Sequence, residues 1–191
     1  LGDNRDQRSM LLWMNLWLSE AQRVMEVGAP IVLFTDWRQL PIMTDALQVA
    51  GFVWRGIAVW DKTEASRPQM DAFKAQCEYI LWGSNGPMPR DGRVGCLPGL
   101  FRHPVKQNDK HHQTGKPLPL MRDVVRICPA GGTILDPFAG SGTTGVAALM
   151  EGRRFIGCEL VDDYVETSRR RLDQAAQETR GEGSGPLFGG D

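Results

Sequence analysis

The stretch ILDPFAGSGTTGVAALMEGRRFIGCEL, residues 134–160, decides the fold. Its middle satisfies the pattern G-x-G-x-x-G, in which Gly140 allows a sharp turn, Gly142 lets a ligand approach the main chain, and Gly145 lets a helix pack closely on a strand. A short apolar strand precedes this turn, a helix follows it, and a second strand comes next at residues 154–160. This order predicts a βαβ unit, whose two strands run parallel in one sheet.

Apolar patterns on both sides of this unit extend it to a three-layer α/β fold with a mostly parallel twisted sheet. In residues 9–28, Leu12, Trp13, Leu16 and Trp17 recur at helical spacing, which predicts a helix with one buried face. The arginine run at 169–171 of the last helix is interpreted as solvated. The remaining predicted elements are strands at 30–36, 52–62, 76–84 and 133–136, and helices ending near 51, beginning at 118 and covering 162–177.

The composition indicates one soluble globular domain of 191 residues, with 41% hydrophobic and 24% charged residues. The four cysteines form no C-x-x-C pair and have no paired histidine spacing, so we predict neither a metal site nor a disulfide framework. No apolar run approaches the roughly 20 residues of a membrane helix. We therefore expect a cytoplasmic protein that does not enter a membrane.

Two acidic residues distinguish the ligands that such a turn could bind. Asp136 comes directly before the glycines, where a carboxylate would repel a pyrophosphate. Glu159 ends the next strand, 19 positions after Gly140, close to the spacing of about 20 at which an acid binds ribose hydroxyls. No Gly-Lys-Ser/Thr follows the turn, which excludes a Walker P-loop. S-adenosylmethionine carries a ribose, an ammonium and a sulfonium but no phosphate, so we predict that the turn holds it.

The same residues resemble a known family. DPFAGSGTTG (136–145) followed by GRRFIGCEL (152–160) is similar to the cofactor-binding motif pair of amino-group DNA methyltransferases. HQTGKP (112–117) resembles their H-p-t-q-K-P motif, and VWDKT (59–63) and CEYILW (77–82) resemble the strands beside their target-base pocket. In the permuted β-type members the catalytic half comes first and the glycine motif last, which is the order found here over residues 9–177. The resemblance implies a Rossmann-like methyltransferase fold and methyl transfer from S-adenosylmethionine to the exocyclic amine of a base in duplex DNA.

The resemblance also implies which residues surround the cofactor. Glu159 would hold the ribose. Thr114, Lys116 and Pro117 would cover the cofactor from the other side. The methionine end would be lined by Asp136, Phe138, Gly140, Ser141, Gly142 and Thr143.

The catalytic tetrapeptide of the family, (D/N/S)-P-P-(Y/F/W), does not occur in the sequence. In the permuted order it would precede the first helix, and the chain begins at Leu1 without an initiator methionine. We therefore expect this loop upstream of Leu1, and the catalytic residues are unassigned. A methyltransferase fold that binds cofactor or DNA without turnover is the alternative.

A basic segment without periodicity, residues 83–113, is interpreted as a loop that contacts DNA phosphates, with a solvated surface loop as the alternative. Its candidate contacts are Arg90, Arg93, Arg102 and Lys106. Candidates near the expected base pocket are Asp36, Trp60 and Lys62, with core packing as the alternative for the tryptophan. The predicted organisation is a catalytic half (1–82), this loop, a cofactor-binding half (114–177) and a flexible tail (178–191).

By resemblance, the partners are double-stranded DNA and a second copy of the chain, in the cytoplasm of a bacterium or in association with a phage, within a restriction–modification setting. Adenine N6 is the preferred acceptor, and N4 of cytosine is the alternative. Methylation of RNA or protein stays open. A nicotinamide dehydrogenase shares the glycine pattern, but Asp136 and the lack of a second mononucleotide half after the turn oppose it.

Overall fold

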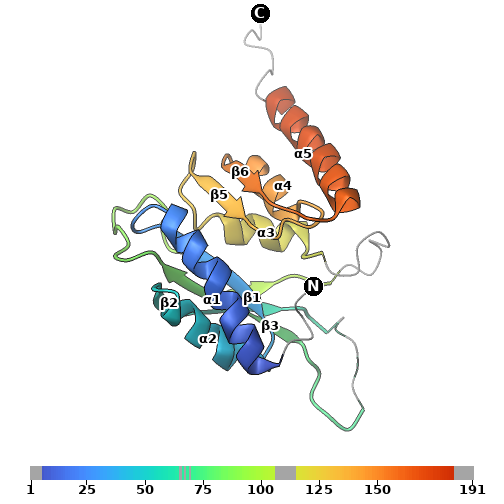
Figure 1. The fold of residues 1–191 in the computed structure, drawn as a ribbon. Coiled ribbons are helices and arrows are strands. Elements are labelled where there is room, and N and C mark those ends of the chain that lie inside the picture. The colour runs from blue at the N-terminus through green and yellow to red at the C-terminus, as the bar shows by residue number, and fades with distance from the viewer. Residues whose placement is uncertain (1–5, 65, 67, 69, 106–114, 183–191) are drawn as a thin grey trace, which may run out of the picture. The chain divides into compact units, whose positions relative to one another are not determined.

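The computed structural model describes residues 6–64, 66, 68, 70–105 and 115–182 (Figure 1). The chain divides into two compact units. The elements of the first unit are α1 (Gln7–Val24), β1 (Pro30–Thr35), α2 (Leu40–Val49), β2 (Val53–Asp61), β3 (Cys77–Ser84) and β4 (Leu100–Arg102). The elements of the second unit are α3 (Leu118–Val125), β5 (Thr133–Asp136), α4 (Thr143–Met150), β6 (Arg154–Gly157) and α5 (Asp162–Glu182).

The sheet of the first unit has the strand order β1-β3-β2-β4. β3 runs antiparallel to both β1 and β2, and β4 runs parallel to β2, so β1, β2 and β4 share one direction. The loop between β2 and β3 closes where Lys62 N–H donates to the Gln76 carbonyl at 2.9 Å, and such a direct connection joins antiparallel strands. The strands predicted at 30–36, 52–62 and 76–84 are confirmed, whereas two of the three strand pairings in this sheet are antiparallel. The reversed direction of β3 and the existence of β4 were not predicted.

Helix α1 contributes Met14 and Leu18, 2% and 0% exposed, to the core of the first unit. The predicted burial of Leu12 and Leu16 was wrong, because they are 64% and 62% exposed. Residues two positions apart on a helix point to nearly opposite sides, so these leucines face away from the core that Met14 and Leu18 fill. The core around these two residues includes Ile31, Met43, Leu47, Phe52 and Leu81, with Trp13 and Trp17 packed against it.

The second unit contains the predicted βαβ arrangement. β5 and β6 pair in parallel, with Ile134 opposite Phe155, and α4 connects them. Helices α3 and α5 both pack against α4. On α5, Ser168 and Ala175 are 7% and 2% exposed, which identifies the face of this helix that lies against the rest of the unit.

Further features concern membranes and metals. In the part of the chain that the structure describes, no helix is both long and apolar enough to cross a membrane. Over the same residues, no group of three or more His, Cys, Asp or Glu side chains is placed to hold a metal ion. The structure pairs none of the cysteines at 77, 96, 128 and 158 in a disulfide.

Candidate cofactor site

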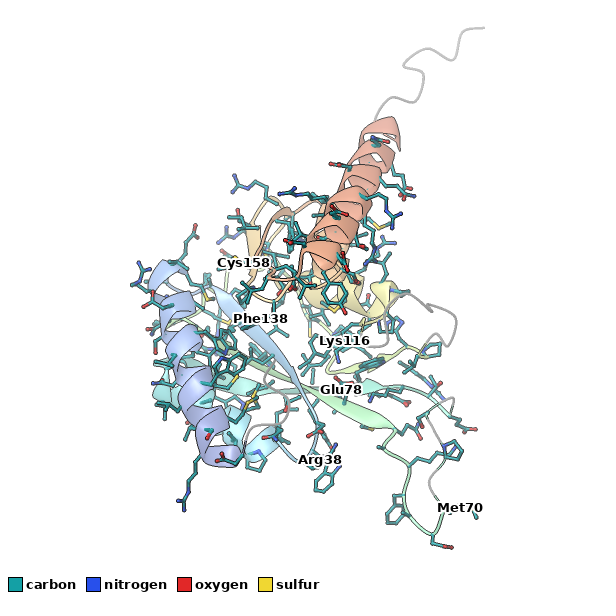
Figure 2. The ribbon with its side chains drawn as sticks, turned by 45° about the vertical axis from the view of Figure 1, so that its right-hand side comes forward. Arg38, Met70, Glu78, Lys116, Phe138 and Cys158 are labelled. Carbon is teal, nitrogen blue, oxygen red and sulfur yellow. The ribbon has the colours of Figure 1, made fainter. Side chains whose placement is uncertain are left out.

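The glycine turn joins the end of β5 to the start of α4, and the chain leaving β6 lies beside it. Ala139 N–H donates to the Cys158 carbonyl, and Cys158 N–H donates to the Asp136 carbonyl, both at 2.9 Å. Gly142 N–H donates to the Ala139 carbonyl at 2.8 Å, which closes the turn directly before α4. Phe138 and Cys158, one from each side of this junction, are labelled in Figure 2. Main-chain bonds therefore fix the position of the turn.

Three glycines give the turn its shape. Gly140 and Gly142 have φ of +52° and +80°, in the left-handed region that favours glycine. A Cβ at Gly145 would lie 2.6 Å from ring carbons of Phe155, so the predicted close packing of helix and strand is confirmed. A Cβ at Gly142 would lie 2.4 Å from Ser168 Oγ, whereas at Gly140 nothing lies within 4 Å. The sequence pattern predicted that a ligand approaches the main chain at Gly142. Gly142 packs against α5, and the main chain is open to a ligand at Gly140 instead.

The Glu159 carboxylate, two residues beyond β6, binds three main-chain N–H groups. Oε2 accepts from Gly140 at 2.8 Å, and Oε1 accepts from Leu160 at 2.8 Å and from Val161 at 3.0 Å. These bonds, the one from Val161 foremost, outweigh the effect of burial and hold the pKa of Glu159 below its ordinary value of 4.5. A carboxylate offers about four acceptor positions, so the ionised side chain can accept one further hydrogen bond, such as that of a ligand hydroxyl.

Replacing Glu159 with glutamine is expected to lower the free energy of unfolding at neutral pH, because an amide puts N–H hydrogens where the carboxylate now accepts them. The pKa of Glu159 is lowered in the folded state, so its contribution to stability is complete above the ordinary value of 4.5 and is lost as the pH falls through the folded-state pKa. Urea unfolding at a series of pH values should show the deficit of the variant shrinking on acidification. The exposed Glu166, changed to glutamine, is the matched control. A pH-independent deficit would contradict this role.

The Asp136 carboxylate lies over the first residues of the turn. Its Oδ1 accepts the Phe138 N–H at 3.0 Å, an Asx-type bond that fixes the half-buried charge at the end of β5. The Phe138 side chain is 53% exposed. With Glu159 bound to Gly140, the turn carries two carboxylates, which repel anionic ligands and favour cationic ones.

Arg171 of α5 is a residue of the site that the sequence reasoning missed. Its Nη1 donates to the Ser141 carbonyl at 2.6 Å, to Ser141 Oγ at 2.9 Å and to Thr143 Oγ1 at 3.2 Å. The interpretation of residues 169–171 as solvated was therefore wrong for the third arginine, which is half-buried while the first two are exposed. Arg171 lies three positions after Ser168 and so on the same helix face, but the burial of Ser168 is known only from the structure.

The remaining predicted cofactor residues precede α3. Thr114 lies outside the described residues. Lys116, labelled in Figure 2, and Pro117 are half-buried, and Pro117 directly precedes α3, which packs against α4. Contact of these two residues with a cofactor stays a prediction.

Asp36 directly follows β1 and organises a short turn. Its Oδ1 accepts the N–H groups of Arg38 and Gln39 at 2.9 and 3.1 Å, and its Oδ2 binds the Arg38 guanidinium at 3.0 Å. Burial raises the pKa of Asp36, but the Gln39 N–H and Arg38 outweigh it and leave the pKa below the ordinary 3.8. The Arg38 guanidinium lies 5.9 Å from the ring centre of Trp37, which is 64% exposed. Contact of Asp36 with DNA stays a prediction.

Trp60 and Lys62 are tied into the first unit. Trp60 is 3% exposed, and its Nε1 donates to the His103 carbonyl at 2.8 Å, as the core-packing alternative describes. Lys62 Nζ lies 3.1 Å from a Glu78 carboxylate oxygen and 5.4 Å from the Trp60 ring centre. The charge of Lys62 is thus partly balanced within the protein, and the predicted DNA contacts of both residues stay predictions.

The arginines of the basic segment are exposed where the structure describes them. Arg90 and Arg93 are exposed. Arg102, in β4, has a side chain that is 68% exposed and lies 3.5 Å from Asp61 Oδ2. Lys106 lies outside the described residues. Phosphate contacts by this segment stay a prediction.

Solved structures identify the fold. The chain is similar to the crystal structure of M1.HpyAVI in complex with SAM, with 27% identity and a TM-score of 0.72 over 85% of this chain and 83% of that one. It is also similar to the cytosine-N4-specific PvuII DNA methyltransferase, with 16% identity and a TM-score of 0.74 over 91% of this chain and 77% of that one. These likenesses confirm the predicted methyltransferase fold.

The sequence identifies the family within that class. A family model described as DNA methylase, of the N6/N4 type, matches residues 1–91 and 98–170. The putative methylase YubD of Escherichia coli K12 is 33% identical over 172 residues, which are 90% of this chain and 71% of that protein. The DNA adenine methyltransferase YhdJ of the same strain is 40% identical over 108 residues, which are 53% of this chain and 36% of that protein. The chain belongs to the DNA methylase family of N6-adenine and N4-cytosine methyltransferases, as its motifs predicted.

Proposed function

We propose that the second unit binds S-adenosylmethionine at its glycine turn, and that the protein transfers the methyl group to the exocyclic amine of a base in duplex DNA. The observation that carries this proposal is the pair of carboxylates, Asp136 and Glu159, which main-chain N–H groups fix at the turn. This charge disfavours a pyrophosphate and suits a ligand with an ammonium and a sulfonium. The likeness to M1.HpyAVI, whose structure is a SAM complex, supports the same cofactor.

The residues present fit the parts of this cofactor. Glu159 has a remaining acceptor position for a ribose hydroxyl, and Asp136 offers a negative charge to the ammonium. At Gly140 nothing lies within 4 Å of an added Cβ, so the main chain is open to a ligand there. When bound, the cofactor supplies an electrophilic methyl group on its sulfonium. The residues of this unit bind and orient it, and orientation alone accounts for much of the rate of such a transfer.

The acceptor base has to leave the DNA stack, which costs a few kcal/mol. We assign the groups that accept hydrogen bonds from its amine to the family's tetrapeptide, which this sequence does not contain. Adenine N6 is the proposed acceptor because YhdJ, a DNA adenine methyltransferase, is 40% identical over the stretch it shares with this chain. Cytosine N4 is the second candidate because the PvuII enzyme, which is cytosine-N4-specific, shares the fold. A homodimer and double-stranded DNA are the partners in this proposal.

The test uses the purified polypeptide, unmethylated duplex DNA and methyl-labelled S-adenosylmethionine. The DNA is digested to nucleosides and examined by mass spectrometry. Label on N6 of adenine would support the first candidate, and label on N4 of cytosine would instead select the second.

Binding measurements separate the other outcomes. Titration calorimetry with S-adenosylmethionine and with NAD should show binding of the first and not of the second. Cofactor binding without label in the DNA would favour a methyltransferase fold that binds without turnover. Binding of NAD in preference to S-adenosylmethionine would overturn the proposal.

A further inference from the structure

Arg171 binds the two hydroxyl groups of the cofactor turn from the side of α5. Its Nη1 lies 2.9 Å from Ser141 Oγ and 3.2 Å from Thr143 Oγ1, and 2.6 Å from the Ser141 carbonyl oxygen. The side chain comes from a helix that begins after β6, so it reaches the turn across 28 to 30 residues of sequence. A single nitrogen of the Arg171 guanidinium therefore donates hydrogen bonds to both hydroxyls.

These bonds determine what the two hydroxyls can offer a ligand. A guanidinium has no acceptor, so Ser141 and Thr143 must accept from it and cannot point their own hydrogens toward it. Each hydroxyl hydrogen is then available for an acceptor elsewhere, and the fixed positive charge of Arg171 adds to its polarisation. The pair is therefore set up to donate, and an anionic oxygen is the partner that gains most.

The start of α4 adds independent support for an anionic group. Gly142 is the N-cap of α4 and has no side chain that could bind the first N–H groups of the helix. The positive end of the helix dipole and these N–H groups favour a negative charge beside Thr143. Ser168, one turn before Arg171 on α5, lies directly under Gly142, so the same helix face fixes this end of the turn.

We propose that Arg171 is a positioning residue that sets the hydroxyls of Ser141 and Thr143 as donors for the carboxylate of the cofactor's methionine moiety. This inference rests on the proposed function, since it assigns one group of the same cofactor. The two charged groups of the methionine moiety then have separate partners. The ammonium of the cofactor lies against the Asp136 side chain, and the carboxylate of the cofactor accepts hydrogen bonds from the hydroxyls of Ser141 and Thr143.

The experiment compares two ligands that differ in the amino acid end. S-adenosylhomocysteine carries the carboxylate, whereas 5′-methylthioadenosine keeps the adenosine and thioether and lacks the amino acid. Calorimetric titration of Arg171→Gln should show at least a tenfold loss of affinity for the first and less than a twofold change for the second. Arg171→Lys, which keeps the charge but not the fork of donors, should recover part of the loss.

The neighbouring Arg170, which is exposed, provides the matched control as Arg170→Gln and should bind both ligands as the wild type does. Equal losses for both ligands in Arg171→Gln, or no loss for either, would overturn the inference and leave the proposed function standing. If Arg171→Gln does not fold, Ser141→Ala carries the test, with the same loss confined to the carboxylate ligand. A wild-type protein that binds neither ligand would instead refute the proposed cofactor, and the inference with it.

Discussion

Replacing Asp136 with asparagine is expected to weaken the binding of S-adenosylmethionine by about 10- to 100-fold. Asparagine keeps an oxygen for the Phe138 N–H, which Asp136 now binds at 3.0 Å, so the turn should keep its shape. What is lost is the negative charge, and a hydrogen bond to a charged group contributes about 1.5–3 kcal/mol. Titration calorimetry at low ionic strength measures the change directly, and added salt should reduce the difference between variant and wild type.

A matched control separates this effect from a general loss of negative charge. Asp162, in the first turn of α5, is exposed, and Asp162→Asn should bind the cofactor as the wild type does. Equal affinities for Asp136→Asn and wild type would show that the carboxylate at the end of β5 does not contact a cationic part of the ligand. The central argument against a pyrophosphate ligand would then fail.

Replacing Gly142 with alanine is expected to lower the free energy of unfolding of the second unit by about 3 kcal/mol. The φ of +80° costs an L-residue about 1–2 kcal/mol. The added Cβ would lie 2.4 Å from Ser168 Oγ, 3.1 Å from its Cβ and 3.2 Å from its Cα, and overpacking of this kind costs roughly 1–3 kcal/mol. Urea unfolding followed by circular dichroism measures the total loss in the free energy of unfolding.

Gly152 is the control for the contact with Ser168. Its φ is +70°, and nothing lies within 4 Å of an added Cβ, so Gly152→Ala should show the backbone cost alone. Equal losses of unfolding free energy in Gly142→Ala and Gly152→Ala would mean that α5 shifts to accommodate the added methyl group without a cost in free energy. Tryptophan fluorescence gives an internal reference for the first unit, because all six tryptophans lie between residues 13 and 82.

The cofactor half of the fold could be predicted because short-range sequence determines it. β5 has the bounds that the apolar run at 133–136 indicated, and Gly145 packs against Phe155 as the spacing required. β4 has three residues, and its position depends on pairing with β2, where Leu100 lies opposite Val59. A pairing between segments about 40 residues apart leaves no local pattern, so this strand could not be read from the sequence.

The candidate site likewise contains some residues that could be predicted from the sequence and others that could not. Asp136 and Glu159 followed from charge and spacing along one motif, and the structure fixes both carboxylates with main-chain N–H groups. Arg171 was missed because a run of three arginines has the composition of a solvated face, although only the packing of α5 decides which of the three turns inward. The packing of α5 also explains why the main chain is open to a ligand at Gly140 and not at Gly142 as predicted, since Ser168 of that helix occupies the space beside Gly142.

The contact between α5 and the glycine turn also sets an order of events during synthesis. Gly142 and Arg171 are about 30 residues apart, which a ribosome covers in roughly two to six seconds. During that interval the nascent chain contains the complete glycine motif, but neither Ser168 nor the guanidinium has yet reached it. The hydrogen bonds from Arg171 and the packing of Ser168 against Gly142 can form only after α5 has been synthesised.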